Sequence, residues 1–227
     1  MEASFGPGLF SFLTDLRANN NRDWFAANKD RYEEQLLEPA LAFINAFAPR
    51  LEKISAHFGA DARPSGGSLF RIYRDTRFSK DKSPYKTNLG IHFRHERAKD
   101  AHAPGYYLHF GPDEVFAGGG IWHPATEAAT AIREGIVADP GRWRRATRTG
   151  AFAKELSLGG DCLKRVPSWA DPDHPFADDL KRKDFFGSTR LSENDVIAPG
   201  FLHEYARICQ AAAPLMQLLC NALTLPY

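Results

Sequence analysis

The sequence contains little cysteine, almost no net charge and no long apolar run. Cysteine occurs three times in 227 residues, at Cys162, Cys209 and Cys220, without the CxxC or Cys/His spacing of a zinc site. These residues are expected to be small buried side chains in a reducing compartment. No metal site and no cofactor is predicted.

The charges nearly cancel, with 29 Lys and Arg against 28 Asp and Glu. This excludes the global basic surface that drives general nucleic-acid binding, so any such binding has to be local. No apolar run approaches the roughly 20 residues that span a bilayer. The N-terminus also lacks the basic start and apolar stretch of a secretory signal. We therefore expect a cytoplasmic protein without a membrane partner.

Hydrophobic periodicity divides the chain into three parts. Residues 7–58 show helical spacing, interrupted at the asparagines of residues 19–21 and again near Pro39 and Pro49. Residues 66–123 are sheet-rich, and their segments follow one another too closely for crossover helices, so they should pair antiparallel. The expected strands in this part lie at residues 69–75, 89–94, 105–110 and 114–117.

Helical spacing returns over residues 124–227. This part includes a basic helix around residues 142–156, a further strand at 183–191, and a closing helix at 201–223 with Pro214 inside it. No repeat or linker divides the chain. We predict a single α+β domain over residues 1–227, in which a mainly antiparallel sheet of about four to six strands packs against N-terminal and C-terminal helices.

The most informative stretch is residues 71–86, RIYRDTRFSKDKSPYK, called here the cationic segment. Its six cations and two acids give a local net charge of +4, whereas the whole chain carries only +1. Holding like charges together is unfavourable unless a partner neutralises them. The cationic segment is therefore a candidate anion-binding site.

Arginine binds phosphate or carboxylate through two parallel hydrogen bonds. We predict that Arg71, Arg74 and Arg77 clamp an anion and that Asp75 orients one of them. The alternative is a salt-bridged strand followed by a solvated lysine-rich loop, because exposed ion pairs contribute only about 0–1 kcal/mol each.

Lys82 and Lys86 add point charges on either side of Tyr85, whose hydroxyl can donate to an anion. Flanking lysines would stabilise a phenolate, so Tyr85 is also a candidate for proton transfer. Lys82 and Asp75 complete the candidate catalytic residues.

The pattern RxxRDxRFxxxKxPYK is complete in residues 71–86. It resembles the hallmark of a bacterial family catalogued as a domain of unknown function, number 2461. Further segments similar to that family lie at residues 19–32, 104–107, 118–122, 174–175 and 184–185. The resemblance spans essentially the whole chain and implies a single-domain architecture. It brings no activity, cofactor or catalytic residue to carry over.

A second candidate is residues 118–124, GGGIWHP, expected between a strand and a helix. Glycines there would let backbone N–H groups approach an anion at the helix N-terminus. Trp122 would stack on the bound molecule and His123 would donate to it. The alternative is a plain turn with a packed tryptophan and a surface histidine.

Two other groups of residues carry less information. The histidines of the sheet region lack the spacing of a known metal motif; they are His92, His95, His102 and His109. A basic helix face near Trp143 would extend a nucleic-acid groove only if it lay beside the cationic segment. Its cations are Arg142, Arg144, Arg145 and Arg148.

Two functions of different kinds stay open. The first is an enzyme that acts on a phosphorylated or carboxylated small molecule bound by the arginines. The second is a non-catalytic module that binds nucleic acid or an acidic protein, with a steep salt dependence. The sequence shows no nucleophile, metal triad or carboxylate pair that would decide for catalysis. An anionic small molecule is the expected partner.

Overall fold

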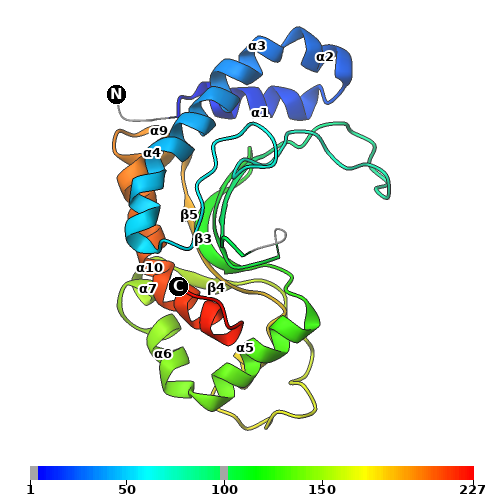
Figure 1. The fold of residues 1–227 in the computed structure, drawn as a ribbon. Coiled ribbons are helices and arrows are strands. Elements are labelled where there is room, and N and C mark those ends of the chain that lie inside the picture. The colour runs from blue at the N-terminus through cyan, green and yellow to red at the C-terminus, as the bar shows by residue number, and fades with distance from the viewer. Residues whose placement is uncertain (1–4, 98–101) are drawn as a thin grey trace.

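The structure is a computed structural model that describes residues 5–97 and 102–227 (Figure 1). It begins with four helices and a π-helical stretch, η1: α1 (Gly8–Ala18), α2 (Arg22–Ala27), α3 (Lys29–Tyr32), η1 (Glu33–Leu37) and α4 (Glu38–Ile54). The expected break is confirmed, because Asn21 caps α2 by accepting a hydrogen bond from the Trp24 amide. Neither proline ends a helix. Pro39 lies in the first turn of α4, where its missing N–H costs little, and α4 continues through Pro49.

Within the described residues, five strands form one antiparallel sheet in the order β1-β2-β3-β5-β4. The fold is therefore α+β, as predicted. The strands are β1 (Leu89–Arg94), β2 (Gly105–Phe110), β3 (Val115–Ile121), β4 (Ser157–Gly159) and β5 (Phe185–Leu191).

The expected strand at residues 69–75 is wrong. Leu69 makes an isolated bridge to Ile91 of β1, where the Phe70 amide donates to the Gly90 carbonyl over 2.9 Å. Beyond residue 70 the chain leaves the sheet and forms a bridge with itself, between Tyr73 and Tyr85. The expected end of β3 at residue 117 is also wrong, because the strand continues through the three glycines.

The remaining helices pack around one side of this sheet (Figure 1). They are α5 (Thr126–Ala138), α6 (Pro140–Arg148), α7 (Gly150–Glu155), α8 (Ala177–Leu180), α9 (Glu193–Ile197) and α10 (Phe201–Ala222). The basic region that was expected to form one helix forms two helices, α6 and α7, which are separated at Thr149. The next residue, Gly150, adopts a positive φ of 61°. The closing helix α10 runs unbroken through Pro214.

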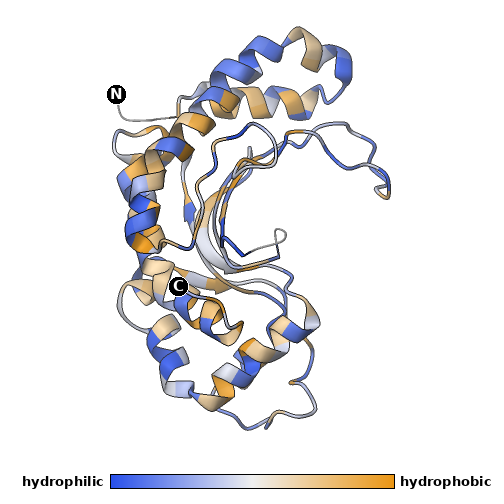
Figure 2. Ribbon diagram, viewed as in Figure 1, coloured by the Kyte–Doolittle hydropathy of each residue, from blue (hydrophilic) through white to orange (hydrophobic). Residues whose placement is uncertain are grey.

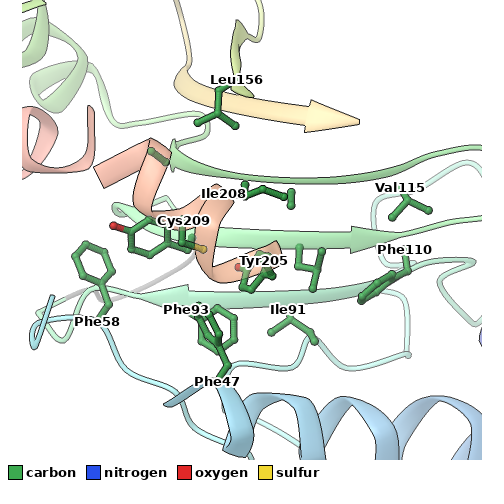
Figure 3. Close-up of a cluster of buried hydrophobic side chains, with 14 of the residues drawn as sticks. Phe47, Phe58, Ile91, Phe93, Phe110, Val115, Leu156, Tyr205, Ile208 and Cys209 are labelled. Carbon is green, nitrogen blue, oxygen red and sulfur yellow. The ribbon is translucent and has the colours of Figure 1, made fainter. Parts of the chain in front are cut away.

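The curved sheet has one covered face and one open face. Side chains alternate across each strand, and the covered face carries Ile91, Phe93 and Tyr106, which are fully buried. They contact α4 and α10, where the Phe47 and Tyr205 rings lie 4.7 Å apart (Figure 3). The concave face points away from both helices (Figure 1).

Hydropathy follows the same division. Figure 2 shows the cationic segment as a mainly hydrophilic stretch that protrudes from the body of the protein.

Cys209 and Cys220 are buried as expected, whereas Cys162 is exposed, which corrects that expectation. Among the described helices, none combines the length and apolar character needed to cross a membrane.

Helix α10 approaches β3 closely at Gly119. A Cβ atom at this position would lie 3.0 Å from the Tyr106 ring, 3.2 Å from Met216 Sδ and 3.3 Å from Ala212 Cβ. The glycine therefore allows the helix to lie directly on the strand.

Gly119→Val should lower the free energy of unfolding by about 1–3 kcal/mol, because its methyl groups overpack this contact. Urea unfolding measures the change. Gly59→Ala is the control, since a Cβ at Gly59 meets nothing within 4 Å. This substitution should change stability by no more than about 0.5 kcal/mol. Equal stability of Gly119→Val and wild type would contradict the packing described here.

Candidate functional site

The cationic segment folds back on itself as a protruding arm (Figure 1). The Arg74 amide donates to the Pro84 carbonyl over 2.9 Å. At the base of the arm, the Asn20 side chain donates to the Tyr85 carbonyl (3.0 Å) and accepts from the Tyr85 amide (3.1 Å). The Tyr85 ring stacks on Phe25 with a centroid distance of 4.0 Å. The N-terminal helices thus fix where the arm begins.

Two of the three predicted clamp arginines already have an acid within the arm. Arg77 and Asp75 form an ion pair at 2.7 Å, and Arg74 pairs with Asp81. The Arg77 hydrogen bonds lower the pKa of Asp75 to about 2. Hydrogen bonds from Ser83 and then from Arg74 lower the pKa of Asp81 to about 2. Asp75 therefore forms its ion pair with Arg77, at the exposed surface of the arm.

The tip of the arm is open to solvent. The Phe78 side chain is 96% exposed, and Lys80 beside it is also exposed. Lys82 is exposed too, although its ammonium donates to the Thr76 carbonyl over 2.8 Å. The tip therefore presents an aromatic ring next to the Arg77 guanidinium, which lies 5.9 Å from its centroid.

The base of the arm holds two cations, Arg71 and Lys86, and neither forms a salt bridge with any carboxylate of the described residues. Lys86 is half-buried, with Nζ 5.3 Å from the centroid of the Phe70 ring. Burial lowers the pKa of Lys86, and the positive charge of Arg71 lowers it further. The two cations at the base of the arm are therefore not paired in salt bridges, although the charge of Arg71 also acts on Asp75.

A pocket of about 350 Å³ lies on the concave face of the sheet next to this base. We call it the concave-face pocket. Phe70 belongs both to its wall and to the contact with Lys86. The lining residues are Phe70, His92, Ala103, Gly105, Tyr107, Phe116, Gly118, Gly119, Gly120, Trp122, Phe186, Gly187 and Ser188.

The floor of the concave-face pocket is made by glycine. Gly118 and Gly120 both lie on the open face of β3, because every second residue of a strand faces the same side. Gly105 of β2 pairs with Gly120. The three glycines of residues 118–120 therefore lie inside a central strand, not in a loop before a helix as expected. Gly120 has a φ of 151°, and a Cβ there would lie 2.3 Å from the backbone of Phe186, so only glycine fits.

His92 contributes a polar ring to this wall. Its side chain is almost fully buried, and Nδ1 has no hydrogen-bond partner in the described part of the chain. Burial, with a smaller contribution from the charge of Arg94, lowers the pKa of His92 to about 4. The imidazole is therefore neutral at physiological pH.

Trp122 and His123 lie where β3 ends. Trp122 is 55% exposed and belongs to the pocket wall. His123 has a positive φ of 46°, which costs energy in a non-glycine residue. Its backbone amide and its Nδ1 lie 2.7 Å and 3.1 Å from the same oxygen of Asp184, a carboxylate that is 1% exposed. A half-exposed imidazole thus lies within ion-pair distance of a buried carboxylate.

The predicted residues thus separate into groups. Lys86 contacts Phe70 of the pocket wall, and Arg71 lies near enough for its charge to act on Lys86. Trp122 belongs to the pocket wall, and His123 follows it in the chain. Tyr85 is buried under the arm, where burial and then Tyr73 raise the pKa of its phenol. This is the opposite of the direction expected from its lysine neighbours.

Several site residues were missed from the sequence. Arg94 lies two residues from His92 on the same open face of β1 and donates to the Gly67 carbonyl over 3.1 Å. Tyr107 and Phe116 form the aromatic wall, and burial raises the pKa of Tyr107 to about 12. The available signal was the alternation of polar and apolar residues in residues 89–94.

The basic face of α6 lies at the opposite end of the protein from the cationic segment (Figure 1). Part of this face is structural, because Trp143 is buried and donates to Asp179, which also binds Arg148 at 2.8 Å. The two basic regions therefore do not form one groove. Within the described ranges, no three His, Cys, Asp or Glu residues come together as a metal site.

A family model described as a conserved hypothetical protein, DUF2461, matches residues 8–218. The chain belongs to this family. No match was found among curated proteins. The DUF2461 description names no activity, so the function of this member has to be argued from its site.

The buried His92 should make stability depend on pH. Its pKa is about 4 in the folded protein and about 6.5 when unfolded, so the unfolded chain takes up the proton first as pH falls. The free energy of unfolding should decrease by about 3 kcal/mol between pH 6.5 and pH 4 from this residue alone, and it should be unaffected above that range. Urea unfolding of wild type and His92→Gln across this range measures the difference. Parallel curves would contradict the burial of a neutral imidazole.

Proposed function

We propose that this protein binds a small anionic molecule with a flat apolar part. The apolar part occupies the concave-face pocket, and a phosphate or carboxylate group lies against Arg71 and Lys86. One observation carries the proposal: Phe70 contacts the ammonium of Lys86 and also forms part of the pocket wall. A cationic site and an apolar cavity therefore adjoin.

The electrostatics favour an anion at this base. A half-buried ammonium next to a guanidinium is destabilised in its charged form, and a bound anion would remove that cost. Arg71 can give an anion two parallel hydrogen bonds, whereas Lys86 acts as a point charge. The paired arginines, Arg74 and Arg77, would have to leave Asp81 and Asp75 to do the same.

The pocket fits the other half of such a molecule. Its volume of about 350 Å³ falls in the range of about 300–1,000 Å³ that is usual for small-molecule sites. The wall rings of Tyr107, Phe116 and Trp122 suit stacking on a flat group. For catalysis, His123 with Asp184 is a candidate for proton transfer, since the imidazole lies within ion-pair distance of the carboxylate.

The first test uses 1-naphthyl phosphate as the probe and calorimetric titration as the measurement. Wild type should bind it more tightly than inorganic phosphate, because the ring adds apolar contact. Lys86→Gln and Arg71→Gln should each weaken binding by about 10- to 100-fold, the usual effect of losing a hydrogen bond to a charged group. Lys86→Gln should not lower the free energy of unfolding, since it removes a repulsion.

Lys80→Gln is the matched control, because it removes the same charge from the exposed tip of the arm. It should leave the affinity for 1-naphthyl phosphate within about twofold of wild type, as a solvated charge contributes little. Equal affinity of Lys86→Gln and wild type would overturn the proposed anion position. Absence of binding by aryl phosphates and aryl carboxylates alike would overturn the function.

Nucleic-acid binding by the tip is the second candidate, and the 96% exposure of Phe78 beside Lys80 favours it. A single-stranded oligonucleotide should then bind more weakly as salt increases, with a logarithmic slope of about −0.7 for each phosphate neutralised. Phe78→Ala and Lys80→Gln should both weaken this binding, and Lys86→Gln should have a smaller effect. Titration at several salt concentrations measures it, and an affinity insensitive to salt would exclude this candidate.

A further inference from the structure

His92 gives the concave-face pocket a means of recognising one atom of its ligand. The side chain is only 7% exposed, and its ring lies 5.9 Å from that of Phe70 and 6.0 Å from that of Tyr107. A polar ring buried among aromatic ones is costly unless it is hydrogen-bonded. This inference rests on the proposed function and names the class of ligand.

The two imidazole nitrogens have different surroundings. Nδ1 is buried and has no partner in the described residues. Nε2 lies over the pocket floor, because a Cβ at Gly105 would be only 2.0 Å from it. Buried acceptors without a partner are tolerated more often than buried donors without one. The proton of the neutral ring therefore belongs on Nε2, so that the donor faces the pocket.

The pocket limits the shape of the ligand group that can accept a hydrogen bond from this donor. Protein atoms already fill the space beside the floor glycines, since a Cβ would lie 2.0 Å from His92 Nε2 at Gly105 and 2.0 Å from the Gly187 carbonyl oxygen at Gly118. The wall rings of Tyr107, Phe116 and Trp122 therefore set the shape of the ligand, and they suit a flat ring. Lys86 and Arg71 are placed for the anionic group, which leaves His92 for a neutral part of the ligand. An acceptor in the plane of the ring is the group that a neutral N–H donor requires.

We infer that Nε2 of His92 donates a hydrogen bond to an acceptor in a flat ring, so that the ligand is an anionic heteroaromatic or cyclic carbonyl compound. A phosphate ester that carries a nucleobase belongs to this class. Burial keeps the imidazole neutral, and the positive charge of Arg94 on the same strand face adds a smaller contribution. The donor is then available throughout the physiological pH range.

The experiment compares 1-naphthyl phosphate with quinolinyl phosphates of the same shape, in which one ring carbon is replaced by nitrogen. At least one quinolinyl isomer should bind wild type about two- to tenfold more tightly than the hydrocarbon, the usual effect of one neutral hydrogen bond. His92→Phe should abolish this preference and still bind 1-naphthyl phosphate. His92→Gln keeps an N–H donor and should retain part of the preference.

A second measurement needs no variant. In wild type labelled with ¹⁵N-histidine, the preferred quinolinyl phosphate should shift the His92 Nε2 resonance more than 1-naphthyl phosphate does. Binding of 1-naphthyl phosphate without preference for any nitrogen isomer, and with no such shift, would overturn this inference and leave the proposed function intact. Absence of binding by every aryl phosphate and aryl carboxylate would instead overturn the proposed function and the inference together.

Discussion

The close contact between α10 and β3 at Gly119 is the constraint on which the site depends. The helix lies against the strand where a side chain would meet Tyr106, Met216 and Ala212. Because α10 and α4 occupy this face, the apolar residues of each strand turn toward them, and the alternate residues turn to the concave face. The pocket is therefore a direct result of a sheet that is covered on one side only.

The concave face combines several features that support the proposed binding site. Its floor lacks side chains at Gly118 and Gly120, its wall carries a neutral buried imidazole, and its edge adjoins two cations. The unpaired buried nitrogen of His92 costs stability. This cost at the wall of one cavity supports the binding site proposed above.

Much of the fold could be predicted from the sequence because its signals are local. The hydrophobic periodicity predicted the strands at residues 89–94 and 105–110 and the closing helix from residue 201. The α+β class followed from these elements. The strand at 69–75 was wrong because pairing depends on distant residues. The charge density of the cationic segment identified a candidate site. The structure shows that Arg74 and Arg77 are paired with acids and that Lys86 forms no salt bridge. This difference depends on how the arm folds back on itself, which the sequence alone does not give.

Two of the tryptophans, Trp122 and Trp143, differ in their exposure to solvent, and this has a practical consequence. Trp122 is 55% exposed and belongs to the wall of the concave-face pocket, whereas Trp143 of α6 is fully buried. Indole fluorescence shifts to shorter wavelength when water is displaced from the ring. A compound that covers Trp122 would therefore change its emission and leave that of Trp143 constant, so the protein contains its own optical reporter of occupancy.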